Sequence, residues 1–302
     1  MLPLRLLFAL LAALVFAGPT RADGNAPQAE MAAAVAAASA ALQPGPRSIP
    51  VAGQARLDLP RGYAFVPAGP AVKLLQAMGN RPGDDLAGMV VPNDENAGWF
   101  MVVRYVASGY IKDDDARDWK ADELIRSIRE GTADNNAERR SRGLPEVEVV
   151  GWVEAPHYDA ASHRLVWSVA SRAKGAPADA DGGINYNTLA LGREGYVSMN
   201  LVTGQKEIEA QKPLARTLLA ALEFNEGKRY ADFNQSTDKV AEYGLAALVA
   251  GVAAKKLGLF AVIAAFAAKF AKVIGVAVFA GGAGLLNFFR KKKAKAAAAD
   301  PA

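Results

Sequence analysis

The segment INYNTLALGREGYVSMNLV, residues 184–202, decides the fold class. Its two halves, 184–191 and 196–202, have the composition of β-strands, and the four residues between them, Gly192-Arg193-Glu194-Gly195, are typical of a turn. The segment therefore predicts a β-hairpin of two antiparallel strands.

Similar strand signals lie on both sides of this hairpin. They predict further strands at 51–52, 55–59, 63–66, 87–91, 99–106, 147–154 and 164–173. Helical spacing of apolar residues predicts only three helices in the same region, at 70–78, at 113–129 with an uneven continuation to 142, and at 206–222. Strands at hairpin spacing, without regular βαβ alternation, indicate an α+β fold: an antiparallel or mixed sheet packed with about three helices.

The composition is that of a folded protein and excludes several kinds of chemistry. The chain has 302 residues, of which 51% are hydrophobic and 22% charged. It contains no cysteine and only two histidines, His157 and His163. Disulfides, thiolate metal sites and cysteine nucleophiles are therefore excluded, and two histidines offer little material for a metal site. No cofactor is expected.

Residues 1–22 are predicted to be a signal peptide. Arg5 precedes an apolar run at 6–17, which is followed by Gly18-Pro19 and a small-residue cleavage site ending at Ala22. The alternative is a first transmembrane helix, but these twelve apolar residues rise only about 18 Å, whereas a bilayer core is roughly 30 Å thick. Residues 23–48 follow as an Ala/Pro-rich spacer, in which 27–42 form either a short helix or a flexible stretch.

The chain from 244 to 289 is predicted to be an amphipathic and transmembrane helical region. Its last twenty residues, 270–289, contain no charge after Lys272 and can cross roughly 30 Å of hydrocarbon as a helix. The apolar stems of Lys269 and Lys272 allow their ammonium groups to reach the interface. A basic stop-transfer cluster follows at once, formed by Arg290, Lys291, Lys292 and Lys293.

Residues 245–268 leave two topologies open. This weakly amphipathic stretch contains lysines among alanines, which indicates either an interfacial helix before a single crossing or a second transmembrane helix that makes a hairpin with the last. The single crossing is favoured because the positive-inside rule places the basic tail, 290–302, in the cytoplasm. The main domain, 49–226, and a juxtamembrane linker, 227–243, then lie on the other side of the membrane.

The net charge of +4 divides unevenly along the chain. Residues 1–22 carry +2 and residues 240–302 carry +7, whereas 23–239 hold 24 Lys and Arg against 29 Asp and Glu, a net charge of −5. Nucleic-acid affinity rests mainly on neutralised phosphates, so no nucleic acid is expected as a partner of this acidic domain. The expected partners are the lipid bilayer and a membrane or periplasmic protein, or a second copy of the chain.

Asp113, Asp114 and Asp115 are the densest polar feature and allow two interpretations. They could bind a divalent cation, although their spacing is not that of an EF-hand loop. Acids at the start of the predicted helix 113–129 are more simply favoured by the helix dipole and by unpaired N–H groups. His157 and His163 lie on a predicted loop between two strands, where an exposed-loop role is favoured because no third or fourth metal ligand is evident.

Several short motifs, in one order along residues 49–290, resemble a bacterial family of membrane-anchored proteins, domain of unknown function 2167. They are LPRGYAFV (59–66), GMVVP (88–92), GYIKDDDA (109–116), GW (151–152), PHYD (156–159), NY (185–186), LGREG (191–195) and YGLAA (243–247). The resemblance implies a membrane-anchored protein of the bacterial envelope and supplies no catalytic residue. The expected location is the bacterial inner membrane, with a single crossing, a periplasmic domain and a cytoplasmic C-terminus.

The sequence thus predicts a non-enzymatic interaction or scaffold module of the envelope. One alternative is a metal-dependent or hydrolytic envelope enzyme that uses Asp113–Asp115 with His157, although no Gly-x-Ser-x-Gly motif occurs in the chain. Another alternative is a ligand-binding sensor domain.

Overall fold

A computed structural model describes residues 25–94, 96–141, 143–180 and 182–250. Its largest feature is an eight-stranded sheet in the order β1-β4-β5-β6-β10-β9-β8-β7, in which every strand pair is antiparallel. The strands are β1 (Gln43–Pro44), β4 (Tyr63–Pro67), β5 (Leu86–Pro92), β6 (Phe100–Val106), β7 (Val147–Asp159), β8 (Arg164–Ala173), β9 (Gly183–Leu191) and β10 (Tyr196–Gly204). The predicted hairpin is β9–β10, whose turn pairs Leu191 with Tyr196.

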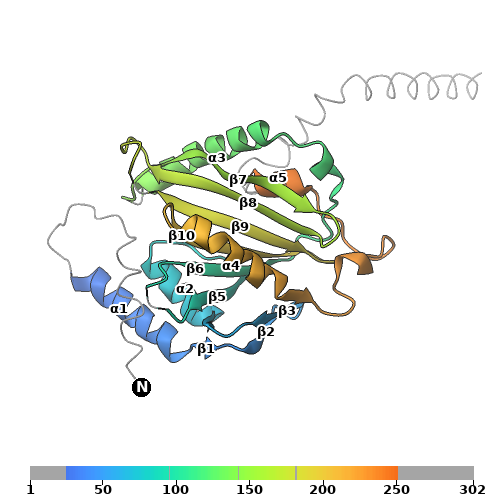
Figure 1. Ribbon diagram of the computed structural model, residues 1–302, viewed down its shortest axis with the longest axis horizontal. Helices are drawn as coiled ribbons and strands as arrows, with labels where there is room; N and C mark the ends of the chain where they lie inside the picture. Colours follow the sequence, from blue (N-terminus) through green and yellow to red (C-terminus); the bar gives the residue numbers. More distant parts are fainter. Residues whose placement is uncertain (1–24, 95, 142, 181, 251–302) are drawn as a thin grey trace, which may run out of the picture. The chain divides into compact units, whose positions relative to one another are not determined.

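One face of the large sheet packs against a smaller sheet and a helix. The small sheet has the order β11-β3-β2, from β2 (Arg47–Val51), β3 (Ala55–Leu59) and β11 (Leu222–Phe224), and α4 (Ile208–Ala220) lies beside it across the large sheet (Figure 1). Alternate residues of β3 are buried, as expected for a strand with one face in the core. They join a core with Val197, Met199 and Leu201 of β10.

A second core lies on the opposite face, over β4, β5 and β6. It is covered by α1 (Asn25–Ala40) and α2 (Ala68–Ala77), which contribute buried alanines and leucines. Phe100 and Val102 of β6 point into this core, whereas Met101 and Val103 point into the first, because successive side chains of a strand face opposite sides. This double burial explains why β6 is almost continuously apolar.

The edge strand β7 is covered along its first half by α3 (Ala121–Ser141). The amide side chain of Asn136, 4% exposed, accepts the N–H of Val147 at 2.9 Å and donates to its carbonyl at 2.8 Å, as a neighbouring strand would. Arg129 donates to the carbonyls of Val149 and Val150. These contacts satisfy backbone groups that an edge strand otherwise leaves open to pairing with another chain.

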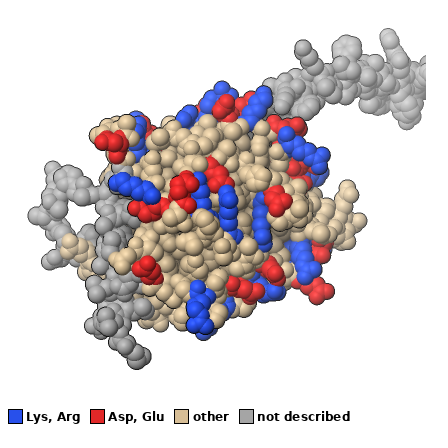
Figure 2. All heavy atoms as spheres, in the orientation of Figure 1, with Lys and Arg blue, Asp and Glu red and all other residues tan. Residues whose placement is uncertain are grey.

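The face that carries α4 shows basic and acidic side chains interspersed (Figure 2). Arg216 of α4 forms an ion pair at 2.7 Å with Glu154 of β7, and both contact the hydroxyl of the fully buried Tyr186. Burial, the largest cause, raises the pKa of Tyr186 to about 12, with the Glu154 carboxylate acting in the same direction. The protonated hydroxyl therefore joins α4 to the sheet.

The predicted α+β class is confirmed, and the sheet is antiparallel rather than mixed. The described residues contain five α-helices, where about three were predicted. Within the predicted spacer 23–48, the helical alternative is the one observed, as α1. Strands β1 and β11 were not predicted because two or three residues carry no periodic signal.

The single helix predicted at 113–129 is wrong in its extent. A short 3₁₀-helix, η3 (Asp114–Arg117), is followed by a break and then by α3, because the 3₁₀ turn closes with the N–H of Asp118 bonded to the carbonyl of Asp115. The loop predicted around His157 is also wrong, since β7 continues to Asp159 through three register irregularities.

Residues 227–243, predicted to be a juxtamembrane linker, pack against the domain. They contain η4 (Tyr230–Asp232), and they lead into α5 (Leu245–Val249). None of the helices in the described ranges is long and apolar enough to cross a membrane. The predicted signal peptide at 1–22, the crossing at 270–289, Lys269, Lys272 and the basic cluster at 290–293 lie outside the described residues.

Candidate functional site

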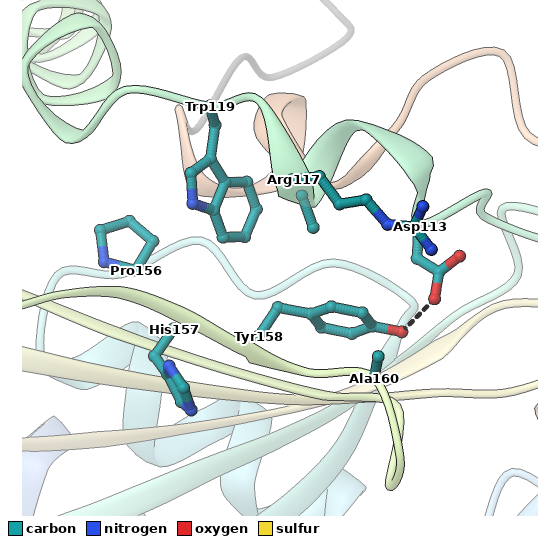
Figure 3. A pocket seen from close by; sticks show the side chains of 8 residues that line it. Asp113, Arg117, Trp119, Pro156, His157, Tyr158 and Ala160 are labelled. Carbon is teal, nitrogen blue, oxygen red and sulfur yellow. Dashed lines mark hydrogen bonds between the residues drawn. The ribbon is translucent and has the colours of Figure 1, made fainter.

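A cavity of about 260 Å³ lies between η3 and the end of β7. Two neighbouring stretches of chain form its walls: 113–119, which holds η3, and 156–160, which ends β7. Figure 3 shows the ring of Tyr158 along the floor, with Trp119 and Pro156 toward one end and Asp113 and Arg117 toward the other. The cavity therefore has an apolar end and a charged end.

Tyr158 connects the cavity to a partly buried relay of polar groups, formed by Asp113, Tyr158 and His163. Its hydroxyl donates to Oδ2 of Asp113 at 2.7 Å and lies 3.1 Å from Nδ1 of His163. Because the phenol proton is used by Asp113, the hydrogen shared with His163 belongs to Nδ1 of the imidazole. Burial, followed by the hydrogen bond to Asp113, raises the pKa of Tyr158 well above its ordinary value, so the phenol stays protonated at physiological pH.

His163 occupies an unusual backbone conformation in the turn between β7 and β8. Its φ is +53°, in the left-handed region that histidine enters more readily than most side chains. Its ring packs on Tyr230, with ring centroids 4.1 Å apart, and its carbonyl accepts the N–H of Leu191. The ring contact with Tyr230 and the backbone hydrogen bond from Leu191 together hold His163 beside Tyr158.

Tyr110 contacts residues 227–250, a segment that runs back along the end of the sheet. Its ring stacks on Phe233 at 3.8 Å and on Tyr230 at 4.4 Å. Its N–H donates to the carbonyl of Lys239, and its carbonyl accepts the N–H of Ala241, both at 2.8 Å. The 227–250 segment is therefore joined to the domain through aromatic contacts and backbone hydrogen bonds together.

The β9–β10 turn binds the same segment. Arg193 donates from Nε and Nη2 to the two carboxylate oxygens of Asp238, at 2.6 and 2.8 Å. The guanidinium, followed by the backbone N–H of Asn234, holds the pKa of Asp238 well below its ordinary value. The bidentate geometry fixes both the position and the orientation of the segment.

Asp115 caps α5 from outside that helix. Its carboxylate accepts the N–H of Leu245 at 3.1 Å and of Ala246 at 3.0 Å, two of the groups that a helix start leaves unpaired. Gly244, at the N-cap position, has no side chain to do this, and a Cβ there would collide with the Asp115 carboxylate. The predicted capping role of the aspartates is thus observed for Asp115, but on a different helix.

The structure separates the site residues that the sequence grouped. Asp113 joins the relay, Asp114 is exposed at the start of η3, and Asp115 caps α5. His157 lines the cavity, but Figure 3 shows its ring directed away from Tyr158, as expected for adjacent residues of a strand. Within the described part of the chain, no group of three or more His, Cys, Asp and Glu side chains could hold a metal ion.

Sequence reasoning did not assign Tyr110, Tyr158, Tyr230 or Arg193 to the site. A signal was nevertheless available, because four of the family motifs meet here. Their contacts are the bond from the N–H of Gly109 to the carbonyl of Glu194, the bond from Tyr158 to Asp113 and the two bonds to Asp115 from 245 and 246.

Fold and site together define an α+β domain whose own C-terminal chain returns to close one end of an antiparallel sheet. The chain belongs to the family described as Protein of unknown function (DUF2167), which matches residues 43–280 and confirms the predicted resemblance. The cyanobacterial PsbP (CyanoP) of Synechocystis, solved in solution, is 13% identical, with a TM-score of 0.36 over 69% of this chain and 98% of that chain. No curated protein matches the chain.

Proposed function

We propose that this protein is a membrane-tethered envelope module that acts by binding another protein or a second copy of itself rather than by catalysis. The single observation that carries the proposal is the attachment of the 227–250 segment to the domain. This segment precedes the apolar stretch predicted to cross the membrane, and Tyr110, Arg193 and Asp115 each hold a different part of it. The last described residues before that stretch are therefore fixed to the domain.

The relay supports a structural role more than a catalytic one. Tyr158, at its centre, stays protonated and gives its hydrogen to Asp113, and the His163 ring is packed on Tyr230. The enzyme alternative requires His157 to act with the aspartates, yet its ring points away from Tyr158 and from the Asp113 that Tyr158 contacts. No specific observation therefore favours the enzyme alternative.

The proposal is tested by crosslinking the full-length chain in native membranes and identifying the products by mass spectrometry. A reproducible partner or a self-oligomer is expected, and the capture of neither would contradict the proposal. The matched control is Arg193→Ala, which removes one attachment of the 227–250 segment and should alter the crosslinked sites. Turnover on a hydrolase substrate panel that disappears in His157→Ala would support the enzyme alternative instead.

Topology is tested separately with reporter fusions at Phe224 and after Lys295. The proposal expects the first reporter outside the cytoplasm and the second inside it. A second reporter outside the cytoplasm would establish the transmembrane hairpin, and a first reporter inside would overturn export of the domain. A chain without residues 1–22 serves as the control, since it should keep both reporters in the cytoplasm.

A further inference from the structure

The cavity between η3 and β7 has the size of a small-metabolite site. Its volume of about 260 Å³ is just below the roughly 300–1,000 Å³ typical of pockets for drug-sized ligands. Its lining residues come from two stretches that the Tyr158–Asp113 bond holds together. The cavity is therefore a fixed feature of the fold that suits a ligand of few heavy atoms.

Two opposite charges face its charged end without neutralising each other. The side chain of Arg117 is exposed and forms no hydrogen bond or ion pair with any residue that the structure describes. Asp113 uses Oδ2 for Tyr158, whereas its Oδ1 accepts no hydrogen bond within the described ranges. The lining of this end thus includes a guanidinium and a carboxylate, and both the guanidinium and Oδ1 of the carboxylate have unused hydrogen-bonding capacity.

This pair of charges selects the charge type of the ligand. A simple anion would pair with Arg117 but be repelled by Asp113, and a simple cation would meet the reverse situation. A ligand that carries an ammonium and a carboxylate close together satisfies both residues. In a free α-amino acid these two groups are attached to one carbon, whereas in a peptide they lie at opposite ends.

The other end of the cavity accounts for the rest of such a ligand. Trp119, Pro156 and the ring of Tyr158 present apolar surface there (Figure 3). An aliphatic or aromatic side chain directed away from the charged end would lie on these rings.

We propose that this cavity binds a free α-amino acid with an apolar side chain. Arg117 holds the ligand carboxylate, Asp113 accepts a hydrogen bond from its ammonium group through Oδ1, and Trp119 with Pro156 contacts its side chain. This inference goes beyond the proposed function, because a tethered interaction module needs no ligand. Ligand titration tests this inference, whereas crosslinking tests the proposed function.

The test is isothermal titration calorimetry on the purified full-length protein with four related probes. They are leucine, leucine amide, N-acetyl-leucine and N-acetyl-leucine amide, which carry both charges, only the cation, only the anion and neither. Leucine should bind at least tenfold more tightly than each of the other three, because each lost charge-assisted hydrogen bond is worth about tenfold to hundredfold in affinity.

Two variants and a matched control complete the experiment. Arg117→Gln should weaken leucine binding by about tenfold or more without affecting folding, since its side chain has no partner to lose. Asp113→Asn keeps an oxygen that can accept the Tyr158 hydrogen bond and should abolish the preference for leucine over N-acetyl-leucine. Arg126→Gln, an exposed arginine on α3 outside the cavity, should leave the affinity unchanged.

Three outcomes would overturn the proposal. They are the absence of leucine binding, equal binding of the charged and blocked probes, and an unchanged affinity after Arg117→Gln. If the proposal fails in any of these ways while crosslinking still captures a partner, the proposed function is unaffected.

Discussion

Asp115→Ala is expected to release α5 while leaving the rest of the domain folded. The carboxylate accepts two backbone N–H groups at 3.0 and 3.1 Å, and nothing in Gly244 can replace it. Loss of an N-cap side chain costs about 0.5–2 kcal/mol. Because two donors lose a charged acceptor, we expect about 1.5–2 kcal/mol, at the upper end of that range.

This free energy is large for a helix of five residues. At 1.4 kcal/mol for each factor of ten, the open state of α5 should become about 10- to 30-fold more populated. Leu245 and Val249 are buried, so the opening should expose them together. The change should remain local, because the strands of the large sheet do not depend on Asp115.

Hydrogen exchange of the full-length protein, followed by mass spectrometry, measures this opening. Peptides covering 240–250 should lose protection in Asp115→Ala, whereas peptides from β9 and β10 should not. Asp114→Ala is the matched control, since Asp114 is the exposed neighbour and makes no such bonds. The reasoning is refuted if both variants behave alike, or if protection at 240–250 is unchanged in Asp115→Ala.

Three further perturbations test the attachment of the 227–250 segment. Tyr230→Phe removes a 2.8 Å hydrogen bond to a buried carbonyl and should lower the free energy of unfolding in denaturant melts by about 0.5–1.5 kcal/mol. An unchanged free energy would mean that the carbonyl has found another donor. Gly109→Ala should destabilise the protein by about 1–3 kcal/mol, because its φ is +88° and a Cβ there would lie 2.6 Å from a backbone oxygen. Gly131→Ala is the control: this glycine lies within α3 without close neighbours, so the substitution should stabilise the protein by up to about 1 kcal/mol. In the folded protein the pKa of Asp238 lies below its ordinary value of 3.8, so its contribution to stability is complete above that pH and is lost as the pH falls below it. Protease cleavage of the segment should therefore begin to rise below about pH 4. In Asp238→Asn the rate of cleavage should depend less on pH.

The sheet was largely predictable from the sequence because its signals are local. Turn residues such as Gly192 and Gly195 lie between runs of strand formers, and alternate residues of β3 are buried. The full length of β7 was not predictable, since three register irregularities interrupt its alternation. The extent of α1 was also uncertain, because an alanine-rich stretch shows no distinct apolar face.

The site was less predictable because its residues come together only through topology. The sequence singled out Asp113–Asp115 by density, but it could not show that two adjacent carboxylates serve different partners, one in β7 and one in α5. It also treated 227–243 as a linker, because short polar stretches give no periodic signal. Aromatic residues spaced along such a stretch, here Tyr230 and Phe233, indicate that it packs against other rings.

The three attachments of the 227–250 segment have a mechanical consequence. They follow one another along the chain, so tension applied beyond residue 250 reaches the α5 cap first, the backbone pairing of Tyr110 second and the Arg193–Asp238 ion pair third, before the ring contacts of Phe233 and Tyr230. Each carries the full load only after the one before it has broken, so the attachments are loaded in sequence. A pull on the chain beyond residue 250 would therefore detach the segment stepwise, before the load reaches the eight-stranded sheet.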